Sequence, residues 1–328
     1  MSHLFQQGFF VRQPAWHGLG TVVQDYPGID EAMRLAGHDH EIECKPLMVV
    51  GGQQLAGWKA LARKDTGAVI SVMNSTYEVI QNRTPWEMID QLFKAGAKFE
   101  TAGILKGKFD ENSKEVKGQV YWTLALLDEP GVIKGDNSPT YPYLASTWSH
   151  DGSQALRFRA MDVRIVCANT HHAAMYGVNG ADLDVSIRHF GKVEARIQAA
   201  TTAIRMARDA HKVYVAAANE LAGIVCTDAM LELFIETIVP LPDAKLCTDR
   251  VRANVKASRE EARKLFDGKT IAPAIRNTAY GMVEVGVEYF DHVRKSLSKD
   301  SYFTRNVMKV DAQKAGLVQT AREICLAV

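Results

Sequence analysis

The sequence predicts an α+β fold: a curved, mostly antiparallel sheet with one or two helices in the N-terminal part, followed by a long helix and a helical C-terminal part. Up to about residue 188, short segments rich in β-branched and aromatic residues are bounded by Gly, Asp, Asn or Pro, which is typical of strands joined by turns. Beyond that point alanine becomes abundant, and no proline interrupts residues 192–221, which favours one long helix. We therefore expect a mixed β-rich domain over residues 1–190 and a helical region over residues 191–328 that packs on it.

Each expected element has its own boundary signals. Six segments qualify as strands, at residues 41–50, 58–63, 68–73, 99–105, 120–127 and 143–148. A short helix is expected over residues 30–35. A second helix is expected to begin at Thr84, where the threonine, Pro85 and Glu87 form a capping box. The polar centre between Leu105 and Gln119 suits a hairpin loop. In the C-terminal part, helices are expected at about 192–221, 228–239, 250–266, 273–296 and 310–326.

The overall charge balance limits what the chain can bind. Its 328 residues carry a formal net charge of +1, so a site for a polyanion has to come from an uneven distribution of charge. Residues 245–269 are such a basic segment, and on the expected long helix Arg205, Arg208 and Lys212 share one face. The five cysteines are an odd number without a CxxC pair, which favours reduced thiols. With no signal peptide and no membrane-length apolar stretch, we expect a cytoplasmic protein that does not enter a membrane.

Motifs that would identify an enzyme are absent. The chain contains no GxxxxGK[ST] loop, no GxSxG elbow and no HExxH helix, and we expect no cofactor. His38, His40 and Cys44 do not have a recurrent zinc spacing, so no metal is expected. Cys167 with His171 or His189 would make a nucleophile–base pair, but a cysteine within a strand of Val and Ile is more typical of a core.

The stretch from Asp151 to Thr170 is the most informative one. A strand here would place Arg157 and Arg159 on one face and Arg164 on the other. Buried arginine needs a partner, so these positions require either an internal carboxylate or an external anion. We expect Arg164 to have an internal partner, and Arg157 and Arg159 to be the better candidates for an external anion.

Several motifs then occur in an order that resembles a known family. They are PAWHGLGT near the start, YEVIQN at 77–82, ETAG at 100–103, HDGSQALRF at 150–158, VRIVCANT at 163–170, SIRH at 186–189 and NTAYGMVEVGVEYFDH at 277–292. Together they resemble the phage/plasmid-like proteins of domain-of-unknown-function family 932, known for the LGT in the first motif. The matching residues are Trp16, His17, Gly18, Gly20, Asn82, Asp151, Gly152, Arg164, Cys167, Asn169, Arg188 and His189. His171 and His172 depart from the common pattern. The resemblance implies a phage, prophage or plasmid context and does not imply a mechanism.

Three functions remain open on this basis. The first is binding and annealing of single-stranded DNA in recombination, by a non-enzymatic homo-oligomer in the form of a ring or filament. The order of a sheet and then a long helix is similar in outline to phage single-strand annealing proteins. The DNA-contacting residues would be Arg157, Arg159, Arg164, Arg188, Arg205, Arg208 and Lys212, with Tyr143 and Trp148 stacking on bases.

The second function is an enzyme acting on a nucleotide or nucleic acid, with polar motif residues converging on one pocket. Its residues would be His17, Asn82, Asp151, Asn169 and His189, joined by Arg164 and Arg188. The third is an interaction protein that antagonises a host defence system.

Overall fold

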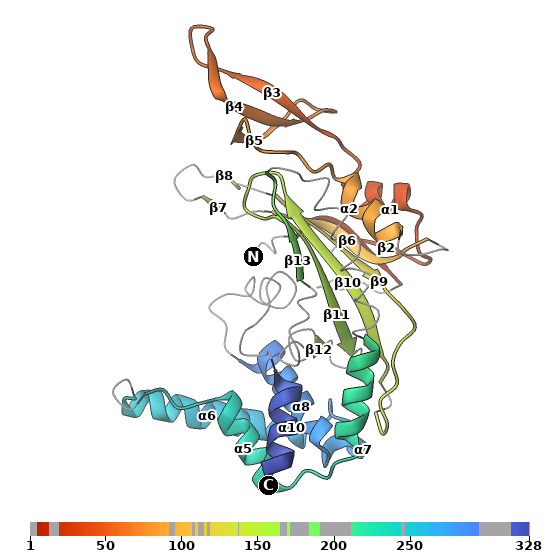
Figure 1. Cartoon of the computed structure of the whole chain (residues 1–328), viewed down its shortest axis with the longest axis vertical. Helices are drawn as coiled ribbons and strands as arrows, with labels where there is room; N and C mark the ends of the chain where they lie inside the picture. The colour runs from red at the N-terminus through yellow and green to blue at the C-terminus, as the bar shows by residue number, and fades with distance from the viewer. Residues whose placement is uncertain are drawn as a thin grey trace. The chain divides into compact units, whose positions relative to one another are not determined.

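A computed structural model describes residues 5–12, 20–91, 96–106, 109–110, 115–116, 119–136, 138–164, 169–170, 184–190, 211–243, 247–294 and 316–327. It confirms the α+β class. Strands dominate the described N-terminal residues and helices dominate the described C-terminal ones (Figure 1).

The largest sheet in the described part of the chain has eight strands. Seven follow the order β12–β11–β10–β9–β6–β1–β2, and β13 pairs with β11 outside that path. Their bounds are β1 Phe5–Val11, β2 Thr21–Val23, β6 Lys98–Lys106, β9 Gln119–Leu126, β10 Thr140–Ser149, β11 Leu156–Arg164, β12 Asn169–Thr170 and β13 Asp184–Ile187. The β1–β2 pair is parallel, whereas β1–β6, β6–β9 and β9–β10 are antiparallel. The strands predicted at 99–105, 120–127 and 143–148 are confirmed.

Two smaller sheets come from hairpins. The strands β3 Ile42–Met48, β4 Gln54–Arg63 and β5 Val69–Asn74 form an antiparallel sheet in the order β3–β4–β5, which confirms the other three predicted strands. The strands β7 Phe109–Asp110 and β8 Glu115–Val116 pair with each other, so the expected hairpin between Leu105 and Gln119 is also present.

Two helices accompany the strands, and the predicted start of the second one was wrong. Helix α1, Ile29–Ala36, ends at Gly37 with φ of 75°, a left-handed conformation that glycine adopts readily. Helix α2, Arg83–Asp90, begins one residue before Thr84, and its N-cap is Asn82, whose side chain makes no capping bond. Thr84 is thus the second residue of the helix and not its N-cap, and the amide of Asn82 bonds buried side chains described below.

Helices make up most of the second half of the chain. They are residues 211–222, α5 Asp228–Ile238, α6 Asp249–Phe266, α7 Pro273–Arg276, α8 Ala279–Glu288, a π-helical turn η1 Tyr289–Val293, and α10 Leu317–Ala327. Every residue of α8 is buried, so this helix forms the centre of the helical core. The single helix predicted over 273–296 is interrupted, because the Thr278 side chain accepts a bond from Gly281 N–H and starts α8 anew. Of the predicted 192–221 helix, only its last turns lie within the described residues.

The chain divides into two compact units. The first comprises Met1–Leu127, Tyr143–Ala160 and Leu183–Ala207, and the second comprises Asp128–Pro142, Met161–Asp182 and Arg208–Val328. Residues 128–142 belong with the helices because Asn219 accepts a bond from Lys134 N–H at 2.7 Å and donates one to the Val132 carbonyl at 3.3 Å. The predicted domain boundary near residue 190 stays a prediction.

A pair of glycines sets the spacing between β1 and β6, and this gives a test of the fold. Gly8 and Gly103 are register partners, and a Cβ on Gly103 would lie 2.2 Å from the Gln7 carbonyl oxygen and 2.9 Å from Gly8 Cα. Because backbone has to move to make room, we expect Gly103→Ala to lower the free energy of unfolding by about 1–3 kcal/mol. Gly28→Ala is the control, since its Cβ meets no atom within 4 Å, and it should cost less than about 1 kcal/mol. Equal losses in urea titrations of the two variants would contradict this packing.

Candidate functional site

A buried polar centre lies in the first unit and is built from three segments distant in sequence. After Gly37 the burial of successive side chains alternates: His38 and His40 are buried, whereas Asp39 and Glu41 are exposed. Asn82 is contributed from the start of α2. Trp148 and His150 follow from the end of β10.

His38 is held by two hydrogen bonds that fix its tautomer. Its Nε2 lies 2.8 Å from the Gly103 carbonyl oxygen and must donate, because a carbonyl only accepts. Its Nδ1 therefore carries the lone pair and accepts from Trp86 Nε1 at 3.2 Å. The ring also meets Trp86, Tyr121 and Trp148 edge-to-face, with centroids 5.1–5.5 Å apart. Protonation of Nδ1 would place its N–H against the N–H of Trp86, so this site accepts only the neutral ring.

Asn82 is the centre of the network. Its Oδ1 accepts from Trp148 Nε1 at 2.9 Å and from His150 Nε2 at 2.7 Å. Because the indole N–H can only donate, this contact fixes which end of the amide is the oxygen. The Nδ2 then points to His40, 3.1 Å from its carbonyl oxygen and 3.2 Å from its Nε2. One amide thus sets the tautomers of two histidines.

Burial keeps these histidines neutral. It lowers the pKa of His38 to about 3 and the pKa of His150 to about 3, and in the same direction it lowers the pKa of His40. Nδ1 of His150 is a buried acceptor without a hydrogen-bond partner among the described residues. The same burial raises the pKa of Tyr121, whose hydroxyl lies 3.2 Å from His40 Nε2.

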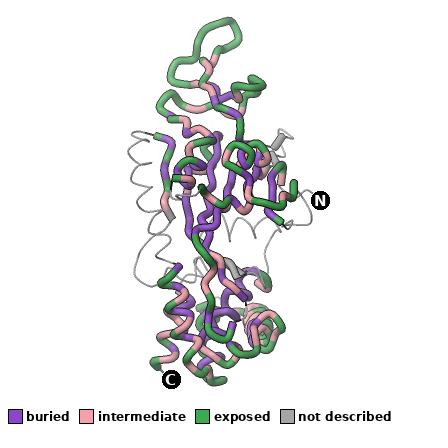
Figure 2. The backbone as a smooth tube through the Cα atoms, turned by 90° about the vertical axis from the view of Figure 1, so that its right-hand side faces the viewer, coloured by how far each residue is buried: buried purple, intermediate pink, exposed green. Residues whose placement is uncertain are grey.

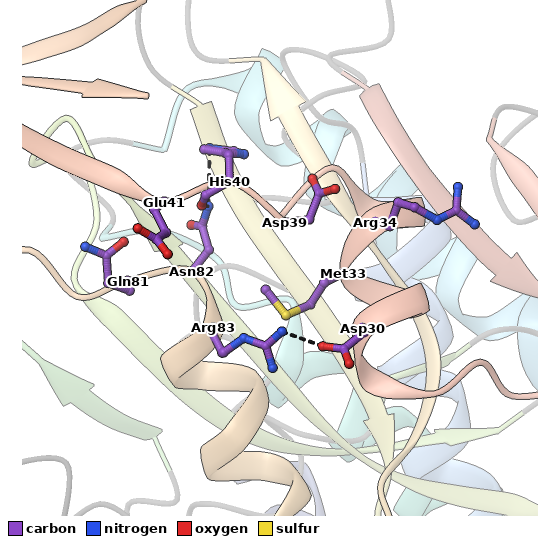
Figure 3. Close-up of a pocket in the computed structure, with 9 residues that line it drawn as sticks. All are labelled: Asp30, Met33, Arg34, Asp39, His40, Glu41, Gln81, Asn82 and Arg83. Atoms are coloured by element: carbon purple, nitrogen blue, oxygen red, sulfur yellow. Dashed lines mark hydrogen bonds and ion pairs between the residues drawn. The ribbon is translucent and has the colours of Figure 1, made fainter. Parts of the chain in front are cut away.

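A pocket of about 510 Å³ opens beside this network. Figure 3 shows its lining, which comes from α1, from residues 39–41 and from residues 81–83. His40, Asn82 and Met33 are its buried members, and the exposed members are charged. Among the latter, Arg83 pairs with Asp30 and Glu41 pairs with Lys64. The pocket therefore has guanidinium and carboxylate groups at its exposed edge, and His40 and Asn82 at its buried base.

The family described as Domain of unknown function (DUF932) matches residues 69–317. The chain belongs to the DUF932 family. No curated protein and no solved structure matches the chain. The DUF932 match contains Asn82, Trp148 and His150, whereas His38 and His40 precede it.

The residues predicted for a polar pocket are only partly described in this DUF932 member. Asn82 lines the observed pocket. His189 stacks on Tyr77 with ring centroids 4.7 Å apart and donates from Nδ1 to the Glu78 carbonyl at 3.2 Å. Asp151 is half-buried, and its charge adds to the burial that raises the pKa of Tyr77. His17 and the side chain of Asn169 lie outside the described residues, so convergence on one pocket stays a prediction.

The residues predicted to contact DNA fall into three groups. Trp148 is fully buried, Tyr143 is 8% exposed and Arg159 is 3% exposed, so none presents a face to a DNA strand in this conformation. Both faces of β11 are covered at Phe158 and Arg159, which strand alternation alone could not reveal. Arg157 is half-buried, and Arg188 and Lys212 are exposed. Arg205, Arg208 and the side chain of Arg164 lie outside the described residues. Asp162, on the strand with Arg164, pairs with buried His211.

The alternation of residues 38–41 is the feature of the sequence that could have located this polar centre. Residues 38–41 read His-Asp-His-Glu, and their alternation places both imidazoles inward. Among the residues that the structure describes, no three or more His, Cys, Asp or Glu side chains are grouped to hold a metal ion. The four described cysteines, Cys44, Cys226, Cys247 and Cys325, are free thiols. In the described ranges no helix is both long and apolar enough to cross a bilayer.

Removal of the Asn82 amide is expected to destabilise the first unit strongly. Asn82→Ala leaves Trp148 Nε1–H and His150 Nε2–H buried without an acceptor, at about 1–3 kcal/mol each. We expect a loss of about 2–5 kcal/mol in the free energy of unfolding, measured by urea titration. Asn74→Ala is the matched control, because its carboxamide caps an exposed turn at Thr76, and it should cost about 1 kcal/mol or less. Comparable losses would show that the amide is not the centre of the network.

The buried histidines also predict how stability depends on pH. Their folded pKa values lie below the value of about 6.5 for the unfolded chain, so the unfolded chain binds more protons between pH about 6.5 and about 3. Stability is complete above about pH 6.5 and falls as the pH is lowered, by up to about 1.4 kcal/mol per pH unit for each histidine. His38→Gln cannot titrate, and its stability should fall less steeply by that amount per pH unit. Identical slopes for wild type and variant between pH 7 and 5 would contradict a neutral His38.

Proposed function

We propose that this chain binds single-stranded DNA and assists its annealing during recombination by a phage, prophage or plasmid, as a cytoplasmic homo-oligomer that catalyses no covalent step. The observation that supports this proposal most strongly lies on α6. Arg252 and Lys256 are exposed cations for which the described part of the chain provides no carboxylate partner.

The two cations continue a row whose other members are neutralised. Positions 252, 256, 259 and 263 follow the i, i+4, i+7, i+11 spacing and share one face of α6. Arg263 pairs with Asp228 at 3.0 Å and with Glu232 at 3.3 Å. Arg259 pairs with Glu236 at 2.7 Å.

Helix α5 ends at Ile238, two residues after Glu236. It therefore has no further carboxylate to pair with Lys256 and Arg252, which continue the row of cations on α6. Lys256 and Arg252 lie about 4.5 Å and about 10 Å further along α6 from Arg259. An unneutralised pair at one end of an otherwise neutralised row is a local positive charge on a chain with a net charge of +1. A local positive charge of this kind attracts a phosphate backbone, whatever its base sequence. Arg250 and Lys212 are further exposed cations of the same unit.

Charge reversal on this row tests the proposal. We expect Arg252→Glu with Lys256→Glu to weaken binding of a fluorescent oligonucleotide and to reduce the slope of log affinity against log salt by about 0.7 for each lost phosphate contact. Lys64→Glu with Lys264→Glu is the control, because it makes the same change in net charge at two exposed lysines paired with Glu41 and Glu261. Binding that ignores salt, or equal losses for both double variants, would refute the proposal.

A second candidate function is an enzyme that acts on a nucleotide at the pocket beside His40. The observation favouring it is that Asn82 and His40 lie together at the pocket floor, with Arg34 and Asp39 at its edge. A guanidinium suits a phosphate, and a carboxylate suits ribose hydroxyls or base amino groups. Thermal shift with mononucleotides tests this reading: stabilisation lost in Arg34→Ala but kept in Arg252→Glu with Lys256→Glu would place the ligand in the pocket.

A further inference from the structure

The small sheet β3–β4–β5 exposes an unusual amount of apolar surface. Of the fifteen exposed large hydrophobic side chains in the described ranges, seven lie between residues 48 and 72. Figure 2 shows the tube through this sheet, at the top of the view, mostly in the colour of exposed residues. Isolated exposed apolar residues are ordinary, but a concentration of them marks an interaction surface.

The strand register shows that three of these side chains share one face. Trp58, Ala60 and Ala62 alternate along β4 and point to the same side. Val72 is the partner of Ala60 and Val69 is the partner of Ala62, so both lie on that side as well. Trp58 is 49% exposed, Val72 45% and Val69 63%. Ala60 and Ala62 are themselves buried, at 6% and 0% exposed, so the open apolar surface of this face comes from the tryptophan and the two valines.

The opposite face of the same sheet is already used. Ile42 and Leu61 pack with Tyr77 in a small core there, together with Ile70 and Met73. A sheet with one face in a core normally shows polar residues on the other face. Here the outer face of β4 and β5 breaks that rule.

The charges on this sheet favour a protein over a nucleic acid as the partner. Each described cation of the sheet and its β4–β5 turn already has an anionic or carbonyl partner: Lys45 with Glu43 at 2.8 Å, Lys64 with Glu41 at 2.7 Å, Arg63 with Asp65 at 2.7 Å, and Lys59 with the carbonyls of Ser75 and Tyr77. Only Lys59 lacks a carboxylate, and it lies on the opposite face as the register partner of Met73. The outer face therefore lacks the unneutralised positive charge that attracts a phosphate backbone.

We propose that this face binds the same face of a second copy of the chain. Glu43 and Lys45 give this face one charge of each sign, because they are the register partners of Ala62 and Ala60 and so lie on the same face as Trp58. A two-fold axis in the interface plane and perpendicular to the strands stacks β3 on β3 of the second copy. The carboxylate of each copy then meets the ammonium of the other, and apolar β4 and β5 stack on their own counterparts.

A surface with balanced charge of both signs can meet its own copy without repulsion, whereas the unneutralised end of α6 cannot. This inference specifies the contact of the proposed homo-oligomer. It does not require DNA binding, because it rests on the sheet alone.

Replacement of the apolar residues tests the contact without DNA. By sedimentation velocity over a range of concentrations, we expect wild type to dimerise and Trp58→Ser with Val72→Ser to raise the dimer dissociation constant by about tenfold or more. Val213→Ser with Leu241→Ser is the matched control, since these two side chains are also exposed, at 64% and 52%, and it should leave the constant unchanged. A wild type that stays monomeric at every concentration would overturn the proposal.

A charge swap separates a direct contact from a general effect on the sheet. Glu43→Lys alone places like charges across the two-fold axis and should weaken the dimer, whereas Glu43→Lys with Lys45→Glu restores complementarity and should recover it. A double variant no stronger than the single one overturns the two-fold arrangement. If Trp58→Ser leaves the mass unchanged but abolishes DNA binding, the face belongs to nucleic acid and the proposal fails. Loss of dimer with DNA binding intact supports it, and that result is distinct from a failure of the α6 variants.

Discussion

The carboxamide of Asn82 is the contact on which the first unit depends. Its oxygen accepts from Trp148 and His150, and its nitrogen donates to His40, so it joins the segment after α1, the start of α2 and the end of β10. Because an indole N–H can only donate, the amide has one orientation, and the tautomers of both histidines follow from it. A cluster of this kind is stable only when every ring is neutral. The order of this part of the protein therefore depends on the protonation state of its histidines.

Much of the fold could be predicted from local pattern, because alternation and turn residues locate strands without tertiary information. All six expected strands are present, and α5 and α6 begin and end within one residue of their expected bounds. The start of α2 was misplaced because a capping box is a local signal, and the helix begins at Arg83, so that Thr84 lies inside it. Such a signal is worth about 1 kcal/mol, which tertiary packing can outweigh, and Trp86 and Ile89 of this helix are fully buried.

The candidate site was harder to predict for a related reason. Alternation assigns Arg157 and Arg159 to one face of β11, but it cannot say whether that face is open, and Arg159 proved to be buried. Trp148 is of the residue type that stacks on bases, yet it is buried and its N–H donates a hydrogen bond to the Asn82 amide. Two exposed cations without a described carboxylate partner, Arg252 and Lys256, lie on α6, within the segment that the sequence showed to be basic. Which cations of α6 have a carboxylate partner depends on how α6 pairs with α5, and the sequence pattern does not show that pairing.

The account rests on buried histidines that stay neutral where an exposed histidine would be charged, and nitrogen NMR of selectively ¹⁵N-histidine-labelled protein observes this directly. At pH 5, which lies between the folded pKa values of about 3 and the ordinary value of 6.5, His38 and His150 should give the spectra of neutral rings with the proton on Nε2. The same labelled protein unfolded in urea at pH 5 should show the imidazolium pattern, which serves as the control. Imidazolium signals from His38 and His150 in the folded protein at that pH would contradict the central claim.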